Sequence, residues 1–425
     1  MIAVLFGVFL LTLFLGFPIA FCLGLSSLAY VILADIPLVI LPQKMYAGID
    51  VFVLLCIPGF ILAGNLMNRG GITERIIDFS NAVLGHIRGG LGLANVGASM
   101  IFAGISGTAV ADTASIGAVM IPGMAKEGYE TDFACAVTAS SSTIGPIIPP
   151  SLPMIIAGTL TGLSVAKLFI AGAVPGVLLG VGLMAVSYSI SAKRGHPKGE
   201  RHTLRDIGRS FTGAFWALLM TVVILVGIVG GIFTPTEASV VAALYAVFVG
   251  LFIYRDLKVH EIPQILIDTA VTTSSLMVLV GLANLFGWIL TSEQIPQMIA
   301  KGMLGLTQNK YLILLLINLL LLFVGTFMET IAALIILFPV LLKVALSVGV
   351  DPIHFAIIAV LNLMIGLTTP PVGVCLFVAS SIGKISLGKM SRAILPFLAV
   401  SVIVLLLVTY VPQISLFLPK LLFSR

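Results

Sequence analysis

The chain has 425 residues, of which 59% are hydrophobic and 9% are charged, and its formal net charge is +5. Because a soluble domain is typically about 25% charged, this composition excludes a soluble globular protein and indicates an all-α polytopic membrane protein. The excess of Lys and Arg fits loops at a membrane surface, where lipid is the neighbour, and we expect no nucleic-acid partner.

The first half alternates between apolar runs and breaks. Residues 2–34 are interrupted at Gly16-Phe17-Pro18, which predicts two short helices joined by a sharp turn. A polar linker over 35–50, a helix over 51–67 and a charged loop holding an amphipathic stretch over 73–84 are expected next. Residues 89–124 are broken at Gly104-Ile105-Ser106-Gly107-Thr108, and each half is too short to cross a bilayer. This segment therefore predicts a re-entrant hairpin.

An unusual break follows inside the apolar segment 133–158. Thr143-Ile144-Gly145-Pro146-Ile147-Ile148-Pro149-Pro150-Ser151 contains adjacent prolines, which remove amide donors and disfavour helix at the preceding residue. Non-helical backbone at membrane depth persists only where it is buried in protein or lines a cavity. We therefore expect a broken membrane helix, followed by a helix over 164–190.

After a basic linker over 193–210, the second half repeats this plan. Apolar segments over 211–232 and 238–254 flank Thr234-Pro235-Thr236-Glu237, and a helix over 265–290 precedes an amphipathic stretch over 295–306. The segment 311–340 breaks at Gly325-Thr326-Phe327-Met328-Glu329-Thr330, and 353–380 breaks at Gly366-Leu367-Thr368-Thr369-Pro370-Pro371-Val372-Gly373. A last helix is expected over 394–418.

Four landmarks recur in order at offsets of 217 to 221 residues, which indicates an internal duplication. We expect a first repeat over 1–192, with scaffold helices over 2–67 and a transport part over 89–190. The second repeat would cover 211–425, with scaffold helices over 211–290 and a transport part over 311–400.

The positive-inside rule then predicts orientation. With the basic linker in the cytoplasm, counting crossings places 15 of the 22 Lys and Arg residues on the cytoplasmic side and 7 outside. The two hairpins then enter from opposite faces, and the C-terminus is periplasmic. The repeats are therefore predicted to be inverted, which is typical of secondary transporters with a site near mid-membrane.

Chemistry at the breaks favours a small cation. Unwound carbonyls and Ser or Thr hydroxyls are hard oxygen ligands that can replace the water around sodium. We expect one sodium site in each half, and the same small residues would also allow close helix packing. The candidate sodium ligands are Ser106, Gly107, Gly145, Pro149, Gly325, Thr326, Thr368, Thr369 and Pro371.

Polar residues beside the breaks are candidates for substrate contact. An intramembrane carboxylate is a functional candidate as a cation ligand, a proton carrier or a group that orients the tip, and it can equally cap the helix that starts there. No Lys or Arg lies in the predicted core, so an anion would be held by amides, hydroxyls and bound cations. The candidates are Thr108, Asp112, Ser141, Ser142, Glu329 and Asn362.

These motifs, as an ordered set over essentially the whole chain, resemble the large membrane subunit (DctM/SiaM type) of tripartite ATP-independent periplasmic (TRAP) transporters. The resemblance implies an elevator-type fold and sodium-driven import of a small organic acid, such as sialic acid or a C4-dicarboxylate, across the bacterial inner membrane. It also implies two partners: a small four-helix membrane subunit, which we expect as a separate polypeptide, and a periplasmic substrate-binding protein.

Two alternatives belong to other classes of function. A stand-alone divalent-anion/sodium symporter or antiporter would share the inverted architecture and would need no partner protein. An enzyme is not expected, because the sequence shows neither a metal-binding cluster nor a nucleophile near a base, and no organic cofactor is expected either.

Overall fold

The computed structural model describes residues 1–199, 201, 203–307, 309–326 and 328–423, with side chains except at 104–106, 296, 300, 303, 304 and 306. The elements named within these residues are all helices, and 7 are long and apolar enough to cross a membrane. Large side chains such as Phe14 (85% exposed) and Phe323 (66% exposed) lie on the surface, as expected where lipid replaces water. The predicted all-α polytopic class is confirmed.

The first repeat contains both predicted interruptions, as a hairpin and as a broken helix. Its elements are α1 (Ile2–Phe14), α2 (Ile19–Leu33), α3 (Ile40–Ile49), the 3-10 turn η1 (Phe52–Leu55), α4 (Cys56–Arg69), α5 (Ile72–Leu84), the hairpin α6 (Gly90–Ser106) and α7 (Ala109–Lys126), the broken pair α8 (Thr131–Ser142) and α9 (Leu152–Thr161), and α10 (Val165–Arg194).

The second repeat follows the same order, with one continuous helix where the first has α3 and α4. Its elements are α11 (Leu204–Val229), α12 (Pro235–Phe248), the π-helical turn η2 (Val249–Tyr254), the 3-10 turn η3 (Val259–Glu261), α13 (Ile262–Ser292), α14 (Ile295–Leu306), the hairpin α15 (Lys310–Gly325) and α16 (Thr330–Ser347), the broken pair α17 (Pro352–Gly366) and α18 (Val374–Gly383), α19 (Leu387–Tyr410) and α20 (Gln413–Phe423).

Three expectations need correction. The polar linker expected over 35–50 contains the helix α3. The last helix, expected over 394–418, begins at Leu387 and ends at Tyr410, and α20 follows as a separate helix. Val411 adopts φ −118° and ψ 82° because Pro412 disfavours helical backbone at the residue before it. The linker expected over 193–210 is helical at both ends, which leaves 195–203 between α10 and α11.

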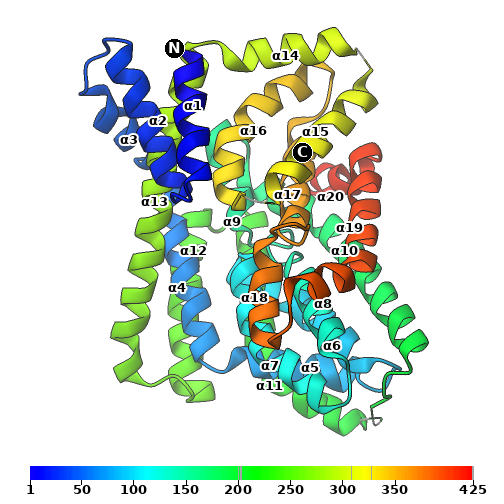
Figure 1. Cartoon of the computed structure of the whole chain (residues 1–425). Helices are drawn as coiled ribbons and strands as arrows, with labels where there is room; N and C mark the ends of the chain where they lie inside the picture. Colours follow the sequence, from blue (N-terminus) through cyan, green and yellow to red (C-terminus); the bar gives the residue numbers. More distant parts are fainter. Residues whose placement is uncertain (200, 202, 308, 327, 424–425) are drawn as a thin grey trace.

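The two repeats have opposite orientations. In Figure 1 the hairpin α6–α7 and the lateral helix α5 lie at the bottom, whereas the hairpin α15–α16 and the lateral helix α14 lie at the top. The equivalent elements thus occupy opposite ends of the molecule. The predicted inverted repeats are confirmed by this arrangement.

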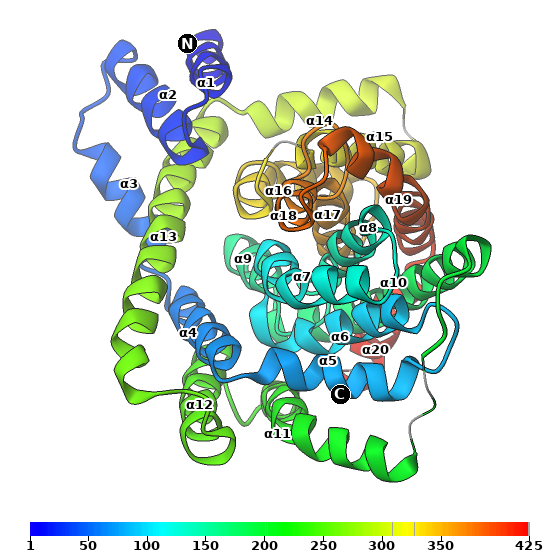
Figure 2. The ribbon, with the colours of Figure 1, turned by 60° about the horizontal axis from the view of Figure 1, so that its bottom comes forward.

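The helices form two groups (Figure 2). We call α1–α4 and α11–α13 the scaffold part; in this view α1–α4, α12 and α13 run along the left side, and α11 lies along the bottom beside α5. We call α6–α10 and α15–α19 the transport part, which gathers on the other side. The lateral helices α5 and α14 connect the two groups in sequence.

Within the transport part, the repeats interlock. The half-helix α9, after the first break, packs against α16 and α17 of the second repeat. The half-helix α18, after the second break, packs against α7 and α8 of the first repeat. Each break is therefore covered by helices of the opposite repeat, which gives its backbone the protein environment that a membrane interior does not supply.

Glycine allows the second hairpin to lie directly on the second break. A Cβ at Gly366 would lie 2.6 Å from the Cα and 2.7 Å from the carbonyl carbon of Gly325, so the two backbones touch. Side chains at these positions would force the hairpin away from α17. The contact fixes where the Gly325-Thr326 tip lies relative to the break.

Hydrogen bonds and ring contacts hold the basic linker against the transport part. The N–H of Gly89 donates to Pro197 O at 3.1 Å, and the N–H of Gly199 donates to Gly85 O at 3.1 Å. The buried His196 ring lies 4.6 Å from the rings of both Tyr129 and Phe133. Its Nε2 contacts the Glu130 carboxylate, and its Nδ1 lies 3.0 Å from Ser191 Oγ.

The substitution Gly366→Ala tests the glycine contact. The added methyl overpacks the site, which typically costs about 1–3 kcal/mol, and the thermal unfolding midpoint in detergent should fall. Gly123→Ala is the matched control, because no atom lies within 4 Å of a Cβ at that helical position. Equal midpoints for both variants would show that the two backbones do not meet.

The pH dependence of stability tests the linker contact. Burial alone raises the pKa of Glu130, but the hydrogen bond and charge of His196, together with Arg194 at 3.6 Å, hold that pKa below its usual value. A carboxyl whose pKa is lowered by folding stabilises the folded state above its unfolded pKa of about 4.3 and loses this effect as pH falls through its folded pKa. Glu130→Gln should therefore lower the unfolding midpoint at neutral pH and make little difference well below about pH 4.

The nearby exposed Glu127 provides the control, and Glu127→Gln should leave the midpoint close to that of the wild type. If the unfolding midpoint of Glu130→Gln stays below that of the wild type by the same amount as pH falls, the carboxyl acts by packing and not by its charge.

Candidate functional site

The hairpin tips rest on the broken helices in both repeats. Gly107 has a φ of 66°, and a Cβ there would lie 3.6 Å from the N of Leu152 and 3.7 Å from the O of Pro150. In the second repeat the N–H of Gly373 donates to Thr326 O at 2.9 Å. Tip and break thus lie together in each repeat, and the role of these residues as sodium ligands stays a prediction.

Hydroxyl groups line the second break. Thr368 and Thr369 donate to Ile365 O at 2.9 and 2.8 Å, and Thr326 donates to Phe323 O at 2.8 Å. A hydroxyl that donates its proton to a carbonyl keeps oxygen lone pairs that can coordinate a cation. The side chain of Ser106, the matching candidate at the first tip, lies outside the described residues.

The two breaks differ in exposure. Gly145, Pro149 and Pro150 of the first break are buried, whereas Thr369 is half-buried and Pro371 is exposed in the second. In each break the peptide bond between the paired prolines is cis. The second break is the more accessible to solutes.

Asp112 lies at the junction of the two repeats. Its carboxyl is fully buried, one turn into α7, and its Oδ2 lies against the backbone of Gly145. Across the junction, Cys375 of α18 lies beside Thr113 and Asp112. A carboxylate, a break and a helix of the opposite repeat therefore meet at one place.

Glu329 caps the helix that follows the second tip. Its carboxylate accepts from the N–H groups of Ile331 at 2.9 Å and Ala332 at 3.2 Å. This is the capping role left open by the sequence, and it satisfies two of the amides that a helix start leaves without partners. The substrate role predicted for Glu329 stays a prediction.

Two further substrate candidates join helices within their own repeats. Ser141 accepts a hydrogen bond from Ser99 at 2.8 Å, which links α8 to α6. Asn362 donates to Asn318 Oδ1 at 2.8 Å, which links α17 to α15. Both are fully buried, and Ser142 likewise donates to Thr138 O of its own helix. Contact of these three with a substrate stays a prediction.

Helix N-termini differ in how they are capped. Ser151 caps α9 by accepting from the N–H of Met154 at 3.3 Å, and Glu329 caps α16. By contrast, α7 and α18 start without a side-chain capping bond, at Thr108 and Gly373. These two helices pack against each other. Their N-terminal amides and positive dipole ends suit an anionic group near the junction.

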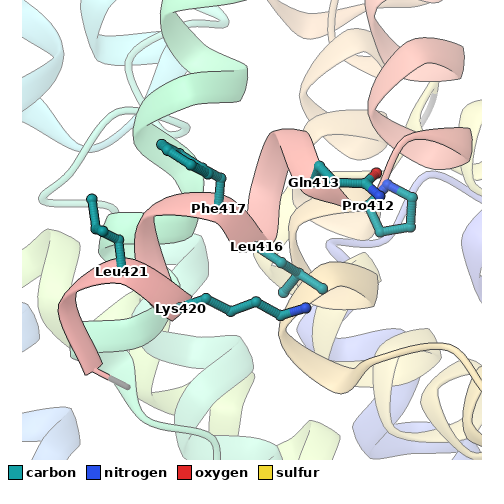
Figure 3. Close-up of a pocket in the computed structure, with 6 residues that line it drawn as sticks. All are labelled: Pro412, Gln413, Leu416, Phe417, Lys420 and Leu421. Carbon is teal, nitrogen blue, oxygen red and sulfur yellow. The ribbon is translucent and has the colours of Figure 1, made fainter. Parts of the chain in front are cut away.

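The hollow at the C-terminal helix does not extend the candidate site. A hollow of about 400 Å³ is lined by Pro412 and residues of α20, and none of its six lining residues belongs to a break (Figure 3). In the described part of the chain, no three His, Cys, Asp or Glu side chains gather as metal ligands. The tips and breaks remain the candidate site.

Thr113 and Cys375 were missed as parts of this site. Cys375 was predicted to be a packing residue, because a single cysteine in an apolar helix has no distinctive pattern. The only local signal was its place shortly after the second break. Thr113 and Cys375 are close together only because the two repeats contact each other, and the spacing of residues along the chain does not predict this contact.

The family model described as "Tripartite ATP-independent periplasmic transporter, DctM component" matches residues 6–414. The sialic acid TRAP transporter large permease protein SiaM of Vibrio cholerae is 45% identical over 410 residues, covering 96% of each chain. The C4-dicarboxylate TRAP transporter large permease protein DctM of Pseudomonas aeruginosa is 45% identical and covers 89% of this chain and 88% of its own. The isethionate TRAP transporter permease protein DctMQ of Oleidesulfovibrio alaskensis is 45% identical, covering 97% of this chain and 66% of its own.

Among solved structures, the YdaH transporter of Alcanivorax borkumensis superposes with a TM-score of 0.59 at 16% identity, covering 90% of this chain and 88% of its own. At that identity the likeness concerns the fold alone. The family match and these relatives extend over nearly the whole sequence. The chain therefore belongs to the DctM family of TRAP transporter large permeases.

Proposed function

We propose that this protein is the large permease subunit of a sodium-driven importer of a small organic acid in the bacterial inner membrane. The observation that carries the proposal is the pairing of a hairpin tip with an unwound break in each of two inverted repeats, which meet where α18 packs beside the buried Asp112. In secondary transporters, sites of this kind bind substrate and coupling ions near the bilayer midplane.

Sodium binding is supported by the ligands available at each break. The second break offers the hydroxyls of Thr368 and Thr369 and the backbone oxygens around Gly325-Thr326. Oxygen atoms of this kind suit a hard cation. Binding of sodium would add positive charge beside the site, and an anionic substrate would then bind more tightly.

A small acid is supported by the names of the relatives. Sialic acid, C4-dicarboxylates and isethionate are chemically diverse, yet each carries a carboxylate or sulfonate group. The N-terminus of α18, which starts at Gly373 without a side-chain cap, offers amide donors for such a group. The proposed substrate is therefore an organic acid of this class.

An elevator mechanism is supported by the division into two groups of helices. The transport part is interlocked, because α9 and α18 each pack on the opposite repeat. We therefore expect it to move as one body. The scaffold part would stay fixed, while α5 and α14 connect the two. The site would then move across the membrane with its ligands in place.

Orientation and partners complete the proposal. We place the linker that contains 195–203 in the cytoplasm and the C-terminus in the periplasm, following the distribution of Lys and Arg. The family name describes a tripartite periplasmic system. We therefore propose a small membrane subunit and a periplasmic substrate-binding protein as partners.

Reconstitution tests the function directly. Liposomes should take up succinate, N-acetylneuraminate or isethionate only with an inward sodium gradient, and only when the chain is combined with a small subunit and a matching binding protein. The same liposomes with a potassium gradient provide the control. Uptake by this chain alone would favour a stand-alone anion symporter or antiporter, and the absence of sodium dependence in the full assembly would refute the proposal.

Substitution of Thr369 and Ser106 tests the sodium sites. Loss of one oxygen ligand worth about 1 kcal/mol should raise the sodium concentration for half-maximal uptake about fivefold in Thr369→Ala and in Ser106→Ala. Thr272→Ala is the matched control, because this hydroxyl also donates to a carbonyl of its own helix, at 2.9 Å, but lies on α13. Wild-type sodium dependence in both test variants would contradict sodium binding at the tips and breaks.

A further inference from the structure

A cavity of about 360 Å³ lies between the scaffold part and the transport part. The scaffold contributes residues from α3 and α13, and the transport part contributes residues from α9 and α16. The volume falls in the range of small-molecule sites in proteins, which is about 300–1,000 Å³. The residues that the argument uses are Lys44, Asn284 and Trp288 from the scaffold, and Leu160, Ile335 and Pro339 from the transport part.

Lys44 gives this cavity a positive charge. Its Nζ lies 5.2 Å from the centroid of the Trp288 ring, and its backbone O accepts from Asn284 Nδ2 at 2.8 Å. None of the residues that line the cavity is acidic. An ammonium group held against an indole, in a cavity without an acidic side chain, offers a counter-charge to an anion.

The position of α3 is well defined, which makes the lysine a fixed feature of the scaffold. A Cβ at Gly281 would lie 3.3 Å from Met45 O, so α3 and α13 are in close backbone contact. With the hydrogen bond from Asn284, this contact holds the segment around Lys44 against α13. The positive charge of Lys44 therefore belongs to the scaffold side of the cavity. The apolar wall of Leu160, Ile335 and Pro339 belongs to the transport part, which would move.

We propose that this cavity receives the carboxylate or sulfonate group of the organic acid, with Lys44 as its counter-charge, as the transport part passes the scaffold. The inference rests on the proposed function and adds a contact to it. The tips and breaks of the transport part supply amides, hydroxyls and sodium ligands, whereas Lys44 supplies a cationic side chain from the scaffold part. The apolar wall faces the carbon skeleton of the acid.

Fluorescence tests the binding step without any transport. The chain has 2 tryptophans, so Trp216→Phe leaves Trp288 as a single reporter beside Lys44. In this background, sodium succinate should change the emission saturably, and Lys44→Gln should weaken the apparent affinity by at least about tenfold, as expected for loss of a hydrogen bond to a charged group. Lys44→Arg should keep most of the affinity.

Two additions separate acid binding from general effects. Sodium chloride at equal ionic strength and the neutral polyol erythritol should leave the emission unchanged. An equal response to chloride would show that the cavity senses ionic strength or any small anion, and this would overturn the proposal. A succinate response that survives Lys44→Gln would also overturn it.

Uptake by the full assembly tests the transport step. Lys44→Gln should raise the KM for succinate, N-acetylneuraminate or isethionate, whichever the wild type transports, by about tenfold with a smaller change in the maximal rate. Lys343→Gln is the matched control, because it removes an equal charge from an exposed position on α16.

An unchanged KM in Lys44→Gln would overturn the inference alone, because the wild type still transports. Absence of sodium-driven uptake in the wild type would refute the proposed function, and the fluorescence result would still decide whether the cavity binds acids.

Discussion

Backbone groups inside a membrane need hydrogen-bond partners from the protein, and the two broken helices depend on this constraint. Each break leaves amides and carbonyls outside a regular helix, and each is covered by helices of the opposite repeat. Contacts such as Gly373 N–H to Thr326 O and the touching backbones of Gly325 and Gly366 complete the cover. The same groups that must be shielded from lipid are thereby brought together as potential ligands for a cation.

Much of the fold was predictable because its signals are local. Paired prolines mark both breaks, a glycine near each hairpin tip marks the reversal, and the amphipathic stretch predicted over 73–84 is helix α5. Recurrence of these landmarks indicated the duplication, and the distribution of Lys and Arg indicated the inversion. By contrast, α3 was missed, because Pro42 and Lys44 within it are more typical of a linker.

The site was predictable only as a set of positions along the chain. In helices buried on every side, such as α8 and α17, the hydrophobic pattern has no exposed face and does not say which neighbour a polar side chain meets. Asn362 faces Asn318, and Cys375 faces Thr113 across the repeats. Likewise, the placement of Lys44 beside Trp288 depends on the packing of α3 on α13, which are far apart in sequence.

The interlocking of α9 and α18 has a consequence for how the protein is made. The first break is synthesised early, but α16 and α17, which cover α9, are synthesised only in the second half of the chain. Contacts between segments so distant in sequence form late, and until then the unwound backbone around Pro149-Pro150 lacks its final neighbours. The first break therefore reaches its final environment only after the ribosome has made α16 and α17.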